Sequence, residues 1–195
     1  LQPEPLLLRG CDGASLNLAR YGMGDARAQA LAQALGSIHG LTALNLADNR
    51  LTKASLVELL SNLDAELLQE IDLSNNYMSY KASLALGRII EASGHLAQLN
   101  LASAQLRGRD GEVLCDALQF CPTLRVLDLS GNSIGLEGGH SVAKLLSHEK
   151  CNIEDLSLAW NDVRAEGAKV IGDALLYNNN LTSIDLSFNN IGTEG

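Results

Sequence analysis

Aromatic side chains are scarce in this sequence of 195 residues, because tryptophan, tyrosine and phenylalanine together make up only 4% of it. A core with so few rings has to be filled by many small aliphatic side chains, which favours a thin and regular architecture. The chain is long enough to bury a substantial core, so neither disulfide bonds nor a metal ion are needed for folding.

Basic residues are also few, with 14 lysines and arginines against 23 aspartates and glutamates, which gives a formal net charge of −9. Most of such a surface repels nucleic acid and anionic membranes. Both are therefore excluded as expected partners. A protein partner with a basic surface is the natural expectation.

Long apolar runs are absent, and none approaches the ~20 residues that a membrane-spanning helix needs. The opening LQPEPLLLRGC lacks the basic and apolar regions of a secretory signal peptide. The sequence begins with leucine instead of methionine, so we expect it to be a fragment of a longer chain. We expect that chain to be intracellular, cytoplasmic and eukaryotic.

Patterns of catalytic or metal-binding residues are lacking as well. No CxxC pair, zinc-ligand spacing or GxxxxGK phosphate loop occurs, and no nucleophile stands beside a base. The sequence thus predicts no enzyme, no cofactor and no metal site. Cys121 and Cys151 occupy nearly equivalent turn positions, so a redox pair is one alternative; small buried side chains are the favoured interpretation.

What the sequence does contain is repetition. Seven segments of the form LxxLxLxxNxL begin near residues 13, 41, 68, 96, 124, 153 and 181, at a spacing of 27 to 29 residues. Self-similarity at such a period is typical of a solenoid. About seven repeats of ~28 residues therefore build the chain.

Each repeat contains one predicted strand and one predicted helix. Apolar residues alternate within the repeated segment, as in Leu127 to Leu129, which is the period of a half-buried strand. Between the segments the period becomes helical: Ala28, Leu31, Ala32 and Leu35 fall on one helix face. The strands should therefore stack in parallel, with the helices behind them.

An asparagine follows most of the strands, where the chain leaves the sheet. A buried amide at this point can satisfy backbone groups that the sheet no longer reaches. We therefore predict a structural column of Asn49, Asn76, Asn132, Asn161 and Asn189. Tyr21 and Ala104 interrupt the column.

These residues carry a family resemblance. The pattern LxxLxLxxNxL, followed by helices such as GLEGGHSVAKLL and RAEGAKVIGDALL, resembles the leucine-rich repeats of the ribonuclease-inhibitor type. The resemblance implies an α/β leucine-rich-repeat solenoid: a curved horseshoe with a concave parallel sheet and convex helices. Residues 1–12 would be an N-terminal flank or a partial preceding repeat. Residues 13–195 would form the repeat domain, with the last repeat truncated.

The resemblance also implies function. It favours a non-catalytic scaffold that binds a protein partner on its concave face and on the loops at the strand ends. The alternative is a regulatory module of a signalling protein, either GTPase-activating or sensing ligands like the NOD-like receptors. Ribonuclease inhibitor is rich in cysteine, whereas this chain has four, so ribonuclease binding is not carried over. The loop with Arg107 and Arg109 is a basic exception.

The candidate binding residues lie on the predicted concave face and its edge. Counted from each anchor, positions 3, 5 and 7 should point out of the sheet, and position 8 lies at its edge. Trp160 and Phe188 occupy position 8 in adjacent repeats. The acidic candidates on the face are Glu70, Asp72, Asp128, Asp155 and Asp185.

A last expectation concerns residues 181–195. The sequence stops where a seventh helix should begin, and a solenoid needs capping repeats to shield its terminal core. We expect self-association through this uncapped end at high concentration, and a strictly monomeric fragment would contradict it.

Overall fold

The computed structural model describes residues 11–12 and 14–193. In this part of the chain the strands form one sheet in sequence order, and the seven strands β2 to β8 run parallel. The parallel strands are β2 (Ser15–Asn17), β3 (Ala43–Asn45), β4 (Glu70–Asp72), β5 (Gln98–Asn100), β6 (Val126–Asp128), β7 (Asp155–Ser157) and β8 (Ser183–Asp185). A two-residue strand, β1 (Cys11–Asp12), pairs with β2 in the antiparallel direction. The sequence did not predict β1. Most of the expected N-terminal flank, residues 1–10, and the first anchor, Gly13, lie outside the described residues.

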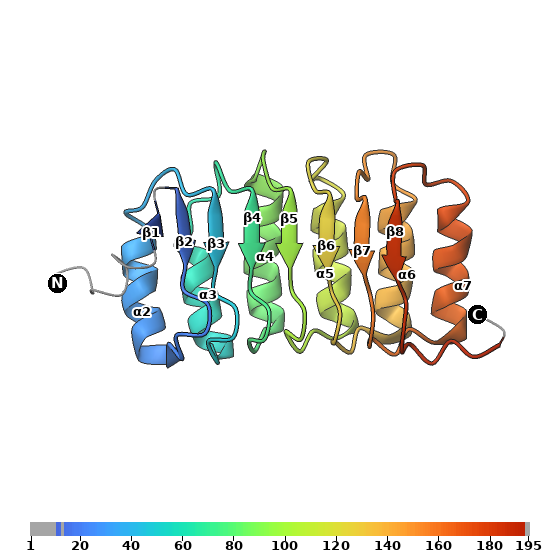
Figure 1. Cartoon of the computed structure of the whole chain (residues 1–195), viewed down its shortest axis with the longest axis horizontal. Helices are drawn as coiled ribbons and strands as arrows, with labels where there is room; N and C mark the ends of the chain where they lie inside the picture. The colour runs from blue at the N-terminus through green and yellow to red at the C-terminus, as the bar shows by residue number, and fades with distance from the viewer. Residues whose placement is uncertain (1–10, 13, 194–195) are drawn as a thin grey trace.

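A helix follows each strand from β2 to β7. The helices are α2 (Gly24–Leu35), α3 (Lys53–Ser61), α4 (Tyr80–Ala92), α5 (Gly108–Leu118), α6 (Gly135–Leu146) and α7 (Arg164–Leu175). They form a second layer behind the sheet, and their row is wider than the row of strands (Figure 1). The stack therefore curves with the sheet on its inner side. The predicted solenoid, with a concave sheet and convex helices, is confirmed.

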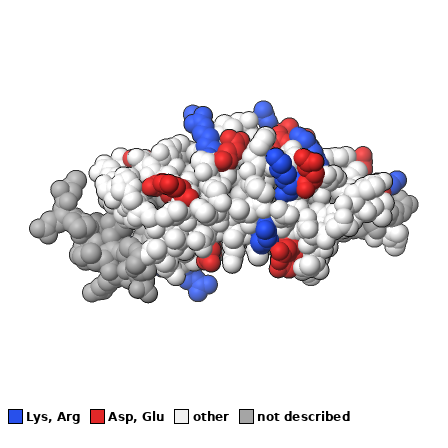
Figure 2. Space-filling view, turned by 90° about the horizontal axis from the view of Figure 1, so that it is seen from above, with Lys and Arg blue, Asp and Glu red and all other residues white. Residues whose placement is uncertain are grey.

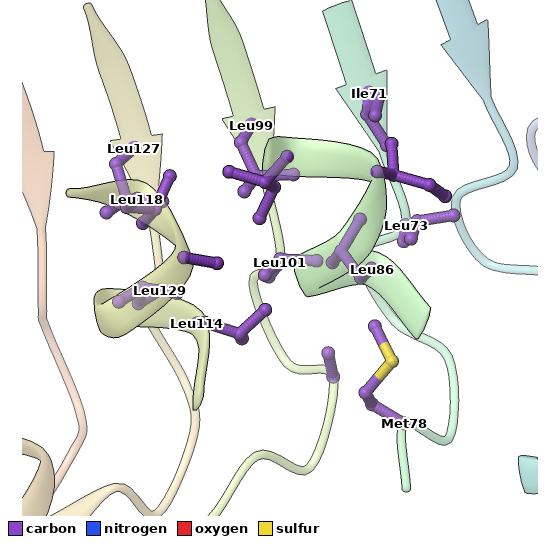
Figure 3. Close-up of a cluster of buried hydrophobic side chains, with 14 of the residues drawn as sticks. Ile71, Leu73, Met78, Leu86, Leu99, Leu101, Leu114, Leu118, Leu127 and Leu129 are labelled. Atoms are coloured by element: carbon purple, nitrogen blue, oxygen red, sulfur yellow. The ribbon is translucent and has the colours of Figure 1, made fainter. Parts of the chain in front are cut away.

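The core lies between these two layers. Ile71, Leu99 and Leu127 point from neighbouring strands toward Leu86 of α4 and Leu118 of α5 (Figure 3). Every residue of this group is at most 4% exposed. Burying one such side chain stabilises the fold by about 2 kcal/mol. The aliphatic core predicted from the scarcity of aromatics is thus continuous along the stack.

The loops that lead from strand to helix are of two kinds. Before α3, α4 and α5 the N-cap residue is extended; these N-caps are Thr52, Ser79 and Arg107. Before α2, α6 and α7 the N-cap is already helical, and the residue after it has a positive φ; these residues are Gly24, Gly135 and Arg164. The loops with an extended N-cap lie in the middle of the stack. The rim where the strands end therefore changes shape along the stack, although the repeats are nearly equal in length.

Buried asparagine amides join consecutive repeats. The side chains of Asn49, Asn76, Asn132, Asn161 and Asn189 are at most 7% exposed. Each Nδ2 donates to a leucine carbonyl of the preceding repeat at 2.7–2.9 Å. Each Oδ1 accepts a backbone N–H from the loop of that same repeat. The amide therefore satisfies backbone groups on both sides of the turn where the sheet ends.

The structure accounts for both interruptions of this pattern. Tyr21 lies in the turn after β2, the first parallel strand, whose other neighbour is the antiparallel β1, so no equivalent preceding turn has to be bridged. Ala104 is fully buried, and its backbone carbonyl accepts the Met78 N–H directly at 3.0 Å. At Ala104 a backbone carbonyl therefore takes the place of the amide oxygen as the acceptor. Ala104 lies before α5, one of the three helices with an extended N-cap.

We predict that Asn161→Ala lowers the free energy of unfolding by about 2–4 kcal/mol, because it leaves several buried backbone groups without partners. Nδ2 of Asn161 donates to the carbonyls of Leu129 and Leu158, and its Oδ1 accepts from Ile134. Urea unfolding followed by circular dichroism measures the change. The matched control is Asn62→Ala at the exposed C-cap of α3, where one bond to Glu58 is lost. A loss for Asn161→Ala no larger than the control's would contradict the bridging role.

Candidate functional site

The strand register aligns the candidate acidic residues in two rows across the concave face. Asp72, Asp128 and Asp185 lie in one row, interleaved with Asn100 and Ser157. Glu70 and Asp155 lie in the neighbouring row and are exposed. All five residues therefore share the sheet face that the helices leave open.

Three of these carboxylates also shape the strand ends. An oxygen of Asp72, Asp128 and Asp185 accepts the backbone N–H two residues ahead, at 2.8–2.9 Å. Asn17, Asn45 and Asn100 make the same bond, so the position has a structural role independent of charge. The hydrogen bond from Ser187 lowers the pKa of Asp185 below its ordinary value. Its negative charge is therefore fixed at neutral pH.

The concave face is hollowed over five of its seven parallel strands. A shallow depression of about 350 Å³ runs from β2 to β6, and its charged lining residues are Glu70, Asp72 and Asp128. No basic side chain lines it among the described residues. The depression therefore offers negative charge and polar amides to a bound partner.

Trp160 and Phe188 form an exposed stack beyond the ends of β7 and β8. Their ring centroids lie 4.0 Å apart, and the ring planes differ by 10°. The tryptophan is 60% exposed and the phenylalanine 65%. Gly131, at the same position in the preceding repeat, offers no side chain against the indole. The pair is thus preassembled, with apolar area left open to solvent.

The backbone makes this location unusual for aromatic residues. Position 8 has a positive φ in every repeat, between 53° and 66°. The seven residues of this rim row are Arg20, Asp48, Asn75, Ser103, Gly131, Trp160 and Phe188. Glycine, asparagine and aspartate tolerate this conformation best, whereas bulky side chains are uncommon there. The turn therefore disfavours bulky side chains at these positions, and the two rings offset part of this cost by stacking on each other.

The structure separates the candidate residues into two groups. Asp155 and Asp185 lie on β7 and β8, the strands that lead to Trp160 and Phe188. Glu70 and Asp72 lie on β4, three strands from β7, which is about 14 Å at ~4.8 Å per strand. A partner that contacts all of them has to cover several repeats of the concave face.

The opposite rim, where the strands begin, is different. Figure 2 looks onto that rim and shows acidic and basic side chains interspersed, without a patch of one sign. Lys144 and Asp116 form an ion pair at 2.8 Å, and Arg125 and Glu154 one at 3.3 Å. Exposed pairs of this kind contribute little to stability. These two pairs neutralise part of the charge on this rim.

The cysteines do not form the redox pair that was one alternative. Cys115, Cys121 and Cys151 are separate buried thiols. Burial raises the pKa of Cys115 to about 12, which keeps it protonated and unreactive. Cys121 lies against the Leu96 carbonyl and Thr123. These residues serve as small core side chains.

The described residues hold neither a metal-binding cluster nor a membrane-spanning helix. Among residues 11–12 and 14–193, no group of histidine, cysteine, aspartate and glutamate is arranged to hold a metal ion. In the same part of the chain, no helix combines the length and apolarity of a membrane span.

Comparison with known proteins gives one family match. The family model described as Leucine Rich repeat matches residues 120–143, 149–172 and 177–195. These matches fall in the second half of the chain, whereas the structural repeats begin at β2.

Three relatives illustrate the similarity. Leucine-rich repeat-containing protein 45 of Gallus gallus is 32% identical over 127 residues, which is 64% of this chain and 19% of that protein. NACHT, LRR and PYD domains-containing protein 13 of Homo sapiens is 30% identical over 197 residues, or 97% of this chain and 19% of that protein. Ribonuclease inhibitor of Mus musculus is 26% identical over 219 residues, which is 95% of this chain and 47% of that protein. The chain thus spans less than half of each.

We predict that Trp160→Ala changes the free energy of unfolding by less than about 1 kcal/mol, because the side chain is exposed and its loss opens no cavity. Leu158→Ala, two residues earlier and fully buried, should cost about 2–5 kcal/mol. Since Trp160 is the one tryptophan of the sequence, iodide should quench the intrinsic tryptophan fluorescence readily. Protection from iodide together with a large loss of stability would show that the indole is a packing residue.

Proposed function

This chain belongs to the leucine-rich-repeat proteins of the ribonuclease-inhibitor type, and we propose that it is a non-catalytic scaffold that binds a protein partner. The partner contacts the concave face and the loops at the strand ends. The name of one relative states that it inhibits ribonuclease, itself a protein. Protein binding is therefore supported within the family, while ribonuclease as the target is not carried over.

The observation that carries the proposal is the exposed stack of Trp160 and Phe188. Binding energy in protein interfaces is concentrated in a few anchors, and tryptophan is among the most frequent. The two rings are already stacked at 4.0 Å, so little side-chain freedom is lost when a partner binds. The positive φ at both residues is a conformational cost that a contact role explains.

The charge of the concave face defines the partner's chemistry. Glu70, Asp72 and Asp128 surround a depression without basic residues, and the whole chain carries a net charge of −9. Asp155 and Asp185 extend the negative charge toward the aromatic pair. A segment with an apolar side chain next to lysine or arginine would fit both features.

A second candidate function is a regulatory module of a signalling protein. The similarity to a NACHT, LRR and PYD domains-containing protein over 97% of this chain favours ligand sensing over GTPase activation. An assay of GTP hydrolysis by candidate GTPases, with and without this chain, separates GTPase activation from ligand sensing.

We also propose an intracellular, cytoplasmic location. Three buried cysteines are present as thiols, which is typical of proteins from reducing compartments.

We predict that Trp160→Ala weakens partner binding by about 2 kcal/mol or more, which is roughly 30-fold. Partners are first captured on immobilised wild-type protein and identified by quantitative mass spectrometry. Affinity is then measured by calorimetry with the purified partner.

The matched control is Phe120→Ala, which removes an equally exposed ring, 69% exposed, from the loop after α5. It should leave affinity unchanged. A partner that binds wild type and Trp160→Ala equally well would sink the proposed site. The same partner should also protect the indole from iodide.

A further inference from the structure

A second surface of the molecule has the opposite charge. On the rim where the strands end, the loops before α4, α5 and α6 and the first residue of α3 line a hollow of about 730 Å³. Lys53, Arg107 and Arg109 line it, although the chain as a whole is acidic. The hollow also includes Gly131, the neighbour of Trp160 in the rim row, so it lies beside the aromatic pair without including it.

The position of the hollow follows from the loop geometry. The N-caps Thr52, Ser79 and Arg107 are all extended, with ψ between 163° and 175°. Two of these loops, those before α4 and α5, line the hollow, and the loop before α6, whose N-cap is helical, lines it as well. The hollow therefore lies where loops of the two kinds meet.

The arginine loop is held in place from both sides. The Arg107 N–H donates to Oδ2 of Asp110 at 2.9 Å, and Oδ1 of Asp110 accepts the Ser83 hydroxyl at 2.9 Å. Arg107 also forms a parallel bridge with Ser133 of the next repeat. The Asp110 carboxylate is buried and used for capping, so it holds the backbone of Arg107 while the guanidinium remains exposed.

Arg109 is ordered by an aromatic ring. Its guanidinium carbon lies 5.4 Å from the ring centroid of Tyr80, in the range of a cation–π contact. Such a contact uses the face of the guanidinium, while the N–H groups at its edge remain available to a carboxylate. Tyr80 is 45% exposed, so its ring also offers apolar area.

The three basic side chains have no acidic partner of their own. Among residues 11–12 and 14–193, Lys53, Arg107 and Arg109 make no ion pair within 4.0 Å. Arg20, Arg125, Lys144 and Arg164 each do. Six other described lysines and arginines are also without an ion pair, so what distinguishes these three is that they line one hollow, which is the arrangement expected for an anionic ligand.

We propose that this hollow binds an acidic segment of a protein, with a carboxylate held by Arg107 and Arg109 and an apolar side chain against Tyr80. Glu137 of α6 also lines the hollow, and its side chain lies against Gly108, the residue between Arg107 and Arg109. A polymer with a phosphate on every residue would press negative charge against Glu137, whereas a peptide can alternate acidic and neutral side chains. The lining therefore favours an acidic peptide over a nucleic acid. This site goes beyond the proposed function, because it requires neither the aromatic pair nor a basic partner.

The test uses fluorescein-labelled peptides and fluorescence anisotropy. The probe is a short peptide in which glutamate alternates with leucine; the comparison peptide has glutamine at every glutamate position. We expect the glutamate peptide to bind at least about tenfold more tightly than the glutamine peptide, because the glutamine peptide cannot form charge-assisted hydrogen bonds with arginine through a carboxylate. Amide chemical shifts in two-dimensional NMR should change at residues 105–110 and 80–81.

Variants with a matched charge control locate the site. Arg107→Gln combined with Arg109→Gln should weaken binding at least about tenfold. Arg88→Gln removes an exposed charge from α4 outside the hollow and should change affinity less than about twofold. Glu137→Gln should strengthen binding about twofold or more, a gain that misfolding cannot produce. Trp160→Ala should have no effect, which separates this site from the aromatic pair.

Three results would overturn the proposal. The first is no binding of the glutamate peptide at about 1 mM, the weak limit of specific recognition. The second is equal binding by the double arginine variant and wild type. The third is preferential, arginine-dependent binding of a single-stranded RNA oligonucleotide, which would assign the hollow to nucleic acid instead.

Discussion

The hydrogen bonding of buried asparagine amides between consecutive repeats is the constraint on which the rest of the structure depends. A parallel sheet of three-residue strands leaves backbone groups unpaired as soon as the chain turns away. Each amide supplies donors to a leucine carbonyl in the preceding repeat and an acceptor for that repeat's loop. Because each repeat satisfies its predecessor, stability is transmitted from neighbour to neighbour along the stack. Ala104 shows the same demand met differently, since its carbonyl takes the Met78 N–H.

The same turn presents the functional residues. The residue before the asparagine position adopts a positive φ in all seven repeats, including the two where Tyr21 and Ala104 replace the asparagine. This conformation directs one side chain per repeat to the rim, where neighbours meet in pairs: Arg20 with Asp48, and Trp160 with Phe188. The backbone sets the position of the row, whereas the residue types in it are free to differ. A scaffold with a fixed core can therefore acquire a new binding surface by changing rim residues alone.

The sequence was sufficient to predict the repeat architecture, because apolar periodicity reports directly on which residues face the core. It also identified Trp160 and Phe188 as neighbours, since 28 residues separate them. The ring stacking, the positive φ and the extended N-caps depend on loop backbone, which periodicity does not encode. Arg107 and Arg109 were noticeable in the sequence because they are basic, but the contact of Tyr80 with Arg109 was not predicted. A signal for it existed: Tyr80 precedes Gly108 by one 28-residue period, so the repeat brings its ring beside the arginine loop. The antiparallel strand β1 left no pattern, because its two residues are too few for one.

Two surfaces of opposite sign can coexist on this molecule because the solenoid keeps them apart. The concave depression faces out from the sheet, with Glu70, Asp72 and Asp128, whereas the basic hollow opens among the loops before α4, α5 and α6. At physiological ionic strength, charges in solvent interact weakly beyond about 8 Å. The net charge of −9 therefore steers approach from a distance, and local side chains decide what binds. A globular domain of this size would bring such surfaces together around one core. An extended stack presents the open sheet face and the strand-end loops as separate surfaces, so the same repeats can carry two surfaces of different charge without a change in the core.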